Sequence, residues 1–219
     1  MVKSPIPWIS GALAGLFVLI GCSSATGGAR EASPQPAYRN RSDSAGIARA
    51  RADSLRYPYT EADVRFMADM IGHHSQALKM AAWAPTHGAG ASVLTLAERI
   101  INGQQDEITT MQLWLRDRQR PVPDPGGTHS HHSDHGMLMP GMLTEDQLRQ
   151  LDAARGPEFD RQFLTFMIQH HLGAVSMVKD LFGSPGAAQD ETVFKFANDV
   201  SVDQSTEIER MEKMLAAAG

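Results

Sequence analysis

Two segments of the chain combine adjacent histidines with flanking methionines. The first is MIGHHSQALKM, from Met70 to Met80, and the second is MIQHHLGAVSM, from Met167 to Met177. Neutral imidazole nitrogen and soft thioether sulfur together suit Cu(I). A polar pattern placed twice in apolar helices adds a desolvation cost that leucine would avoid. The two segments therefore predict metal binding, with copper as Cu(I) first and silver as a soft ion of similar character.

The two histidines of each pair point in different directions when the segment is drawn as an α-helix. At about 100° per residue, Met70 and His74 lie on the inward stripe, whereas His73 and Met80 lie on the flank that faces a neighbouring helix. The second copy repeats this arrangement, with Met167 and His171 inward and His170 and Met177 on the flank.

A second repeated pattern supplies complementary polar residues on other helices. Gln104, Glu107 and Met111 share one helical face. The same face recurs at Gln204, Glu207 and Met211. We therefore expect an interior with approximate two-fold symmetry, in which Met111 and Met211 are candidate metal ligands and the two glutamates are possible ones.

A histidine-rich segment from Thr128 to Met142 lies between the two patterns. Short histidine-rich tracts commonly bind metals, and this one also contains methionine; the alternative interpretation is a solvated linker. Its candidate ligands are His129, His131, His132, His135, Met137, Met139 and Met142. His87, alone in a glycine-rich turn, is expected at the surface.

The elements that must position these residues are all helical. Apolar residues recur with a 3.6-residue period, which predicts long helices over 60–84, 92–118, 157–182 and 190–217 and a short one over 144–154. Thr60 with Asp63 and Thr144 with Gln147 predict capped helix starts, and Pro157 is suited to a first turn. No segment alternates convincingly as a strand does.

An internal repeat organises these helices into two hairpins. A shift of 97 residues superposes the two histidine segments and also aligns Asp63 and Phe66 with Asp160 and Phe163. A shift of 100 residues superposes the two glutamine–glutamate patterns. Hairpins at 57–120 and 156–217, joined by residues 121–143, are each too small to bury an apolar stripe alone. They predict an all-α four-helix bundle over residues 57–217.

The N-terminal segment is expected to lie outside this bundle. Residues 8–21 form an apolar run too short for a comfortable membrane span and suited to a signal peptide. The run ends in LIGC, which resembles a bacterial lipobox and predicts lipidation of Cys22, the only cysteine; the alternative is a plain secretory signal. Residues 23–56 have the composition of a flexible tether. The expected location is the cell envelope, on the periplasmic side in a Gram-negative cell or the extracellular face in a Gram-positive one.

Composition restricts the classes of function. The 219 residues are 42% hydrophobic and carry a formal net charge of −5, which is typical of a globular domain and does not suggest a nucleic-acid partner. No nucleophile–base–orienter trio, phosphate loop or nucleotide fingerprint is evident. A binding protein is therefore favoured over an enzyme.

The segments FMADMIGHHSQALKMA and PGMLTEDQLRQLDAARGPEFDRQFLTFMIQHHLGAVSMV, with the two Q..EI..M helices, resemble a known bacterial family. It is a ferritin-like family catalogued as domain of unknown function 305, and it includes the CopM-type periplasmic copper-binding proteins. The resemblance extends from Tyr57 to Leu215. It implies a four-helix bundle, Cu(I) or Ag(I) binding through methionine and histidine in copper resistance or trafficking, and a copper-handling protein as partner. The matching positions are Met70, His73, His74, Met80, Met111, Met167, His170, His171, Met177 and Met211.

Two other functions compete with copper binding. A di-iron or di-manganese oxidase would use a Glu from each of two helices and a Glu-x-x-His motif from each of the other two. Glu107 and Glu207 could be the single glutamates, but no Glu stands three residues before any of the paired histidines, so iron or manganese is less favoured. The third interpretation is a metal-free interaction bundle of the envelope, with histidine and methionine as core residues.

Overall fold

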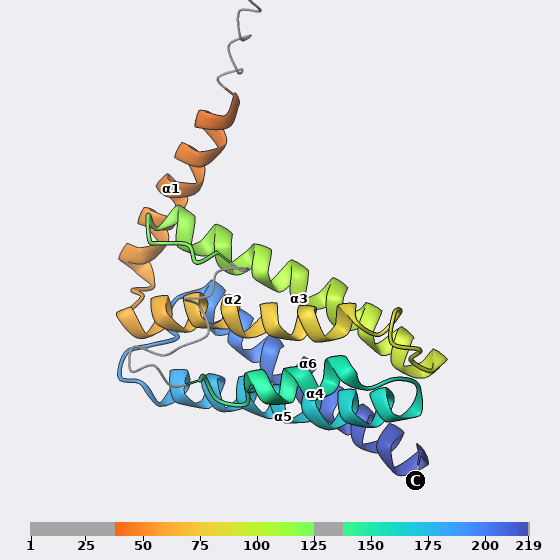
Figure 1. The fold of residues 1–219 in the computed structure, drawn as a ribbon. Coiled ribbons are helices and arrows are strands. Elements are labelled where there is room, and N and C mark those ends of the chain that lie inside the picture. Colours follow the sequence, from red (N-terminus) through yellow and green to blue (C-terminus); the bar gives the residue numbers. More distant parts are fainter. Residues whose placement is uncertain (1–37, 125–137, 219) are drawn as a thin grey trace, which may run out of the picture. The chain divides into compact units, whose positions relative to one another are not determined.

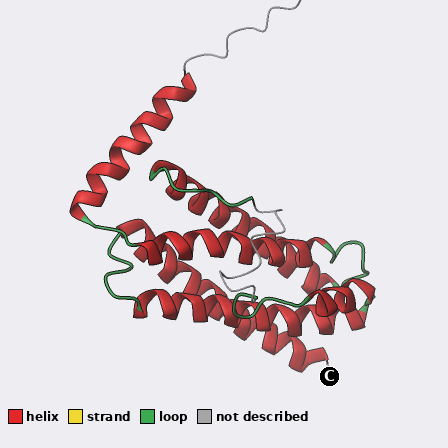
Figure 2. Cartoon of the chain, turned by 60° about the vertical axis from the view of Figure 1, so that its left-hand side comes forward, coloured by secondary structure: helices red, strands yellow, loops and turns green. Residues whose placement is uncertain are grey.

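The computed structural model describes residues 38–124 and 138–218, and this part of the chain contains six helices and no β-strand (Figures 1 and 2). The helices are α1 (Tyr38–Arg56), α2 (Glu61–Ala82), α3 (Ala91–Asp117), α4 (Glu145–Ala153), α5 (Pro157–Gly183) and α6 (Glu191–Ala218). The expected all-α fold is thereby confirmed. None of the helices within the described ranges is long and apolar enough to cross a membrane.

The helix starts predicted at Thr60, Thr144 and Pro157 are present in the structure. The Thr60 backbone N–H donates to Asp63 Oδ2 at 2.6 Å, and the Asp63 N–H donates to Thr60 Oγ1, which completes a capping box at α2. Thr144 and Gln147 form the same reciprocal pair at α4. Pro157 lies in the first turn of α5. Each cap satisfies backbone donors that have no partner within the helix.

Two helical hairpins form the bundle. Helices α2 and α3 pack against each other, as do α5 and α6, and the hairpins meet mainly through α2 and α5. Helices α3 and α6 do not pack closely on one another. The repeat also appears in burial, because residues 101–110 and 201–210 follow the same sequence of buried and exposed positions. These stretches of α3 and α6 therefore bury equivalent residues.

The aligned aspartates Asp63 and Asp160 link the hairpins through backbone amides. The Ala188 N–H, in the turn of the second hairpin, donates to Asp63 Oδ1 at 2.7 Å. The Gly90 N–H, in the turn of the first hairpin, donates to both carboxylate oxygens of Asp160 at 3.1 Å. Each repeat thus caps the turn of the other, and the contacts fix the register in which α2 and α5 meet.

The segment from Met139 to Leu143 lies against α2 and α5. A Cβ atom on Gly173 would overlap the carbonyl of Pro140, so the segment can approach α5 only because this residue is glycine. Gln76 of α2 bonds Leu143 twice, donating to its carbonyl at 3.1 Å and accepting from its N–H at 2.7 Å. Gln76 and Gly173 occupy equivalent positions in the repeat. Gln76 holds the segment by hydrogen bonds, and Gly173 lets it approach α5 because it has no side chain.

The apolar core consists of two clusters that lie towards opposite ends of the bundle. The first core cluster joins the N-terminal parts of α2 and α6 to the C-terminal parts of α3 and α5. The second core cluster joins the remaining parts of the same helices. Buried polar residues occupy the positions between them: His73, His74, Gln104, His170, His171 and Gln204. We call this set the polar layer.

Helix α1 occupies part of the segment whose composition predicts a tether. Its side chains include few large apolar residues, and it contacts α3 through small ones: Ala50 is buried, and Gly46 approaches the carboxylate of Asp117. A helix that packs through glycine and alanine has no apolar stripe to reveal it in the sequence. The tethering role of the segment stays a prediction.

Candidate metal centre

All four paired histidines lie in the polar layer, and each has 0% of its surface exposed. The His73 ring of α2 faces the His170 ring of α5, with centroids 3.9 Å apart and planes inclined by 38°. His74 and His171 extend the row on either side, with centroids 6.4 Å and 6.3 Å from their neighbours in sequence. His73 and His170 therefore each face a neighbouring helix, as the helical geometry predicts.

Each histidine directs its Nε2 atom at an oxygen that accepts. His73 Nε2 lies 3.0 Å from the Pro140 carbonyl, and His170 Nε2 lies 3.0 Å from the His73 carbonyl. The other two Nε2 atoms contact carboxylates at 2.7 Å, His74 with Glu107 and His171 with Glu207. The second of these has full hydrogen-bond geometry, whereas the first has a less favourable angle.

These contacts determine where the proton of each ring lies. A backbone carbonyl can only accept, so His73 and His170 must donate from Nε2. Glu207 accepts from Nε2 of His171 in the same way, and Glu107, 2.7 Å from His74 Nε2, favours a proton at that atom. A neutral ring with its proton on Nε2 has its lone pair on Nδ1. None of the four Nδ1 atoms has a hydrogen-bond partner in the described part of the chain. The Nδ1 lone pairs of four buried rings are therefore available to a metal ion.

The central pair stays neutral at physiological pH. Burial lowers the pKa of His73 to about 3, and neighbouring His74 and His171 act in the same direction against the opposing bond to Pro140. Burial, and then the three other histidines, place the pKa of His170 well below its ordinary value. Neutral imidazole is the form that binds metals, so these rings do not have to lose a charge-bearing proton to become ligands.

The methionines with candidate roles are divided between the two core clusters. Met70 precedes His73 and His74 by three and four positions, and Met167 has the same relation to the second pair, which places thioether and imidazole on one helical face. In the first core cluster lie Met70, Met111, Met139, Met142 and Met177, and in the second lie Met80, Met167 and Met211. The polar layer thus has thioethers on both sides.

Glu107 and Glu207 line a pocket of about 220 Å³ between α3 and α6. Their side chains are 20% and 18% exposed, so each connects a buried histidine to solvent. Gln104 and Gln204 also line this pocket and are each 3% exposed.

Some predicted ligands fall outside the described residues, namely His129, His131, His132, His135, Met137 and the lipidation candidate Cys22. The structure places the remaining two residues of the histidine-rich segment, Met139 and Met142, in the core at 5% and 4% exposure. The apolar run MLMPGML around them was the available sequence signal for this docking.

The carboxylate content does not favour the oxidase interpretation. Across residues 38–124 and 138–218, no group of three or more His, Cys, Asp or Glu side chains is arranged to hold a metal ion. A di-iron site of this architecture would need four glutamates and two histidines. The buried side chains beside the polar layer that could supplement imidazole as ligands include methionines.

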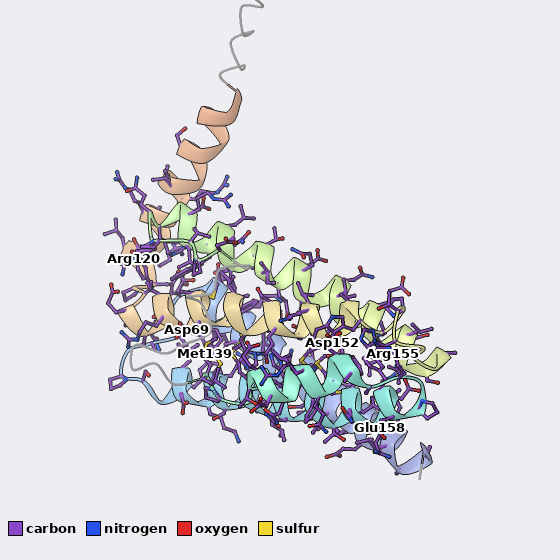
Figure 3. All side chains as sticks on the ribbon, viewed as in Figure 1. Asp69, Arg120, Met139, Asp152, Arg155 and Glu158 are labelled. Carbon is purple, nitrogen blue, oxygen red and sulfur yellow. The ribbon has the colours of Figure 1, made fainter. Side chains whose placement is uncertain are left out.

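His87 corrects one expectation, since it is 5% exposed and not at the surface. Its Nε2 lies 3.0 Å from both the backbone carbonyl and Oδ1 of Asp152, and its Nδ1 lies 2.9 Å from Thr86 Oγ1. It links the α2–α3 turn to the end of α4, where Figure 3 labels Asp152. Both ring nitrogens of His87 are bonded, whereas the Nδ1 atoms of the four paired histidines have no partner among the described residues.

Duplicated hairpins around a buried histidine layer flanked by methionine define a class of helical bundle. The chain belongs to the family described as Domain of unknown function (DUF305), whose model matches residues 63–215.

Solved structures of the family are similar to this chain over most of their length. A putative secreted DUF305 protein from Streptomyces coelicolor is 28% identical, with a TM-score of 0.62, and the match covers 72% of this chain and 94% of that one. A DUF305 fragment from Deinococcus radiodurans is 30% identical, with a TM-score of 0.61 and coverage of 73% and 99%. CopM in its Cu(I)-bound form is 28% identical, with a TM-score of 0.55 and coverage of 71% and 96%. CopM has also been solved with Cu(II) and with Ag bound. No match was found among curated proteins.

Proposed function

We propose that this protein binds Cu(I), and Ag(I) as its analogue, in the polar layer through histidine Nδ1 atoms and methionine sulfurs, and that it sequesters or transfers the metal outside the cytoplasm. The metal is cargo. The structures of CopM with bound copper and silver support this choice of ion for the present chain.

The observation that carries the proposal is the state of the four Nδ1 atoms. Metal-binding histidines characteristically donate their other ring N–H to a carboxylate or a backbone carbonyl, which fixes the tautomer and orients the ring. Three of the four histidines have such a partner at Nε2, and His74 Nε2 lies 2.7 Å from the carboxylate of Glu107. All four leave Nδ1 buried and without a partner among the described residues. A protein that used these rings only for packing would gain by bonding or replacing them.

The site also has the soft character that Cu(I) requires. Thioether sulfur selects Cu(I) over harder divalent ions, and buried methionines lie on both sides of the histidines. Lipidation at Cys22 would hold the bundle at the membrane surface of the envelope. A copper-handling protein that delivers or accepts the ion completes the proposed role.

The histidine-rich loop offers a competing binding site, which a loop variant separates from the polar layer. We expect the variant with His129, His131, His132 and His135 all changed to Ser to retain high-affinity Cu(I) binding, because the proposed ligands lie within the helices. Anaerobic titration against a chromophoric Cu(I) chelator measures affinity and stoichiometry. Loss of all binding in this variant would assign the metal to the loop, and absence of binding in the wild-type protein would favour the metal-free bundle.

A further inference from the structure

Two pockets open on the bundle near the polar layer, and they differ in chemistry. One, of about 410 Å³, lies between α2, α5 and the segment around Met139 and is lined largely by apolar side chains. Figure 3 labels Met139 and Asp69 beside each other at this pocket. The other is the pocket of about 220 Å³ between α3 and α6. A metal ion that reaches buried histidines must enter by one of these faces or by another opening of the bundle.

The α2–α5 face is closed over the histidines. The Met139–Leu143 segment lies against Gly173, and Gln76 holds it by two hydrogen bonds. The carbonyl of Pro140 is engaged with His73 Nε2. Entry from this side would require the segment to detach and these contacts to break.

The α3–α6 pocket has the electrostatic character of a cation path. Glu107, Glu207 and Asp203 line it, with Arg99 as the opposing charge. Burial and the neighbouring carboxylates of Glu107, Glu207 and Asp199 raise the pKa of Asp203, against the lowering effect of Arg99. A concentration of negative charge in a cleft attracts cations.

Two buried amides point to a ligand independently of these charges. Gln104 is 3% exposed, and neither its Oε1 nor its Nε2 has a hydrogen-bond partner in the described ranges. Gln204, equally buried, has no such partner for Oε1. Both line the α3–α6 pocket. Leaving buried polar atoms unbonded costs free energy. The Oε1 atoms of Gln104 and Gln204 could both coordinate a partly hydrated cation.

We propose that the α3–α6 pocket is a cation-binding vestibule through which a monovalent metal ion reaches His74 and His171. The inference rests on the proposed function, since it names the route to that site. Glu107 and Glu207 lie at the inner end of this route, each in contact with one histidine. Gln104 and Gln204 supply oxygen ligands on the way, before the ion exchanges them for nitrogen and sulfur.

The repeat provides a matched pair of positions for testing the vestibule. Asp203 of α6 corresponds to Gly103 of α3 under the 100-residue shift, and both line the pocket. A Cβ atom added at Gly103 would meet nothing within 4 Å. The same helical position can therefore receive a charge or a bulky group with little disturbance of the fold.

The test measures Ag⁺ uptake by stopped flow, with silver nitrate in chloride-free buffer and the loop-histidine variant as the parent protein. Trp114 lies in the first core cluster with Met70 and Met111, so its fluorescence is a suitable reporter. We expect Asp203→Asn to slow uptake about two- to fivefold at low ionic strength, with the difference disappearing as added nitrate screens the charge. Gly103→Asp should accelerate uptake, and Gly103→Phe should slow uptake and release together by about tenfold or more, because a plug in an access route raises one barrier for both directions.

Equilibrium affinity and a control variant make the result decisive. Asp180→Asn removes the same charge from the lining of the α2–α5 pocket and should leave the uptake rate unchanged, and all four variants should retain the parent's Ag⁺ affinity within about twofold. Wild-type rates in Asp203→Asn and Gly103→Phe, or a slow Asp180→Asn, would overturn the vestibule while leaving the proposed function intact. Failure of the parent to bind Ag⁺ at equilibrium would instead overturn both.

Discussion

Replacing His74 and His171 together by leucine should lower the affinity for Cu(I) by at least about 100-fold without lowering the stability of the metal-free protein. The variant removes two nitrogen donors and keeps a side chain of similar bulk. It also removes two buried Nδ1 atoms that have no partner in the described structure. Exchange of an unsatisfied polar group for an apolar one is neutral or stabilising, and the two glutamates released at Nε2 remain partly exposed to water.

Competition titration and thermal unfolding measure the two quantities, and His87→Leu is the matched control. His87 is also buried, at 5% exposure, but both of its ring nitrogens are bonded. Its replacement should destabilise the fold by about 1–3 kcal/mol and leave Cu(I) affinity unchanged. The opposite pattern, with affinity kept and stability lost in the His74 and His171 variant, would mean that these histidines are structural.

The free energy of unfolding should fall as pH decreases from about 6.5 towards 3. Burial lowers the pKa of His73 to about 3, so the unfolded chain binds a proton in this range while the folded chain does not. Stability decreases wherever the unfolded state gains protons preferentially as pH falls. For His73 alone the loss is roughly 2 kcal/mol at pH 5, and the lowered pKa of His170 adds to it in the same direction.

Urea unfolding between pH 7.5 and 4.5 measures this dependence. The variant with both His73 and His170 changed to Leu removes the two groups and should show a clearly flatter profile than the wild-type protein over the same range. Saturating Ag⁺ should raise the stability of the wild-type protein without flattening its profile, because the unfolded chain still gains protons as pH falls while the metal-bound rings stay neutral. Equal slopes in the wild-type protein and the double variant would show that the central histidine pair is not buried in its neutral form.

The sequence predicted the helices and the repeat because both depend on local spacing. Capping at Thr60 and Thr144 involves residues three apart, and the division of His73 from His74 follows from the helical angle. The contacts that complete the site depend on long-range packing. Pro140 contacts His73 because Gly173, far away in the sequence, has no side chain that would block the segment. No local pattern indicates this contact.

The sequence also did not predict the roles of Asp203 and His87. Asp203 has glycine as its counterpart at position 103, so a search for shared residues passes over it although it lines the pocket. His87 lies in a turn whose glycines suggest exposure, yet its ring is buried by its bonds to the end of α4. In both cases the role follows from a neighbour that only the fold brings close.

The most direct measurement of the central claim is the nitrogen chemical shifts of the histidine rings in protein labelled with ¹⁵N-histidine, recorded before and after addition of Ag⁺. Without metal, His73 and His170 should show the Nε2–H tautomer, and rings at His74 and His171 should carry a proton on Nε2. Added Ag⁺ should shift Nδ1 resonances of these paired histidines while their Nε2 protons remain. Metal-induced shifts confined to the loop histidines, or an Nδ1–H tautomer at His73 and His170, would contradict a soft-metal site in the polar layer.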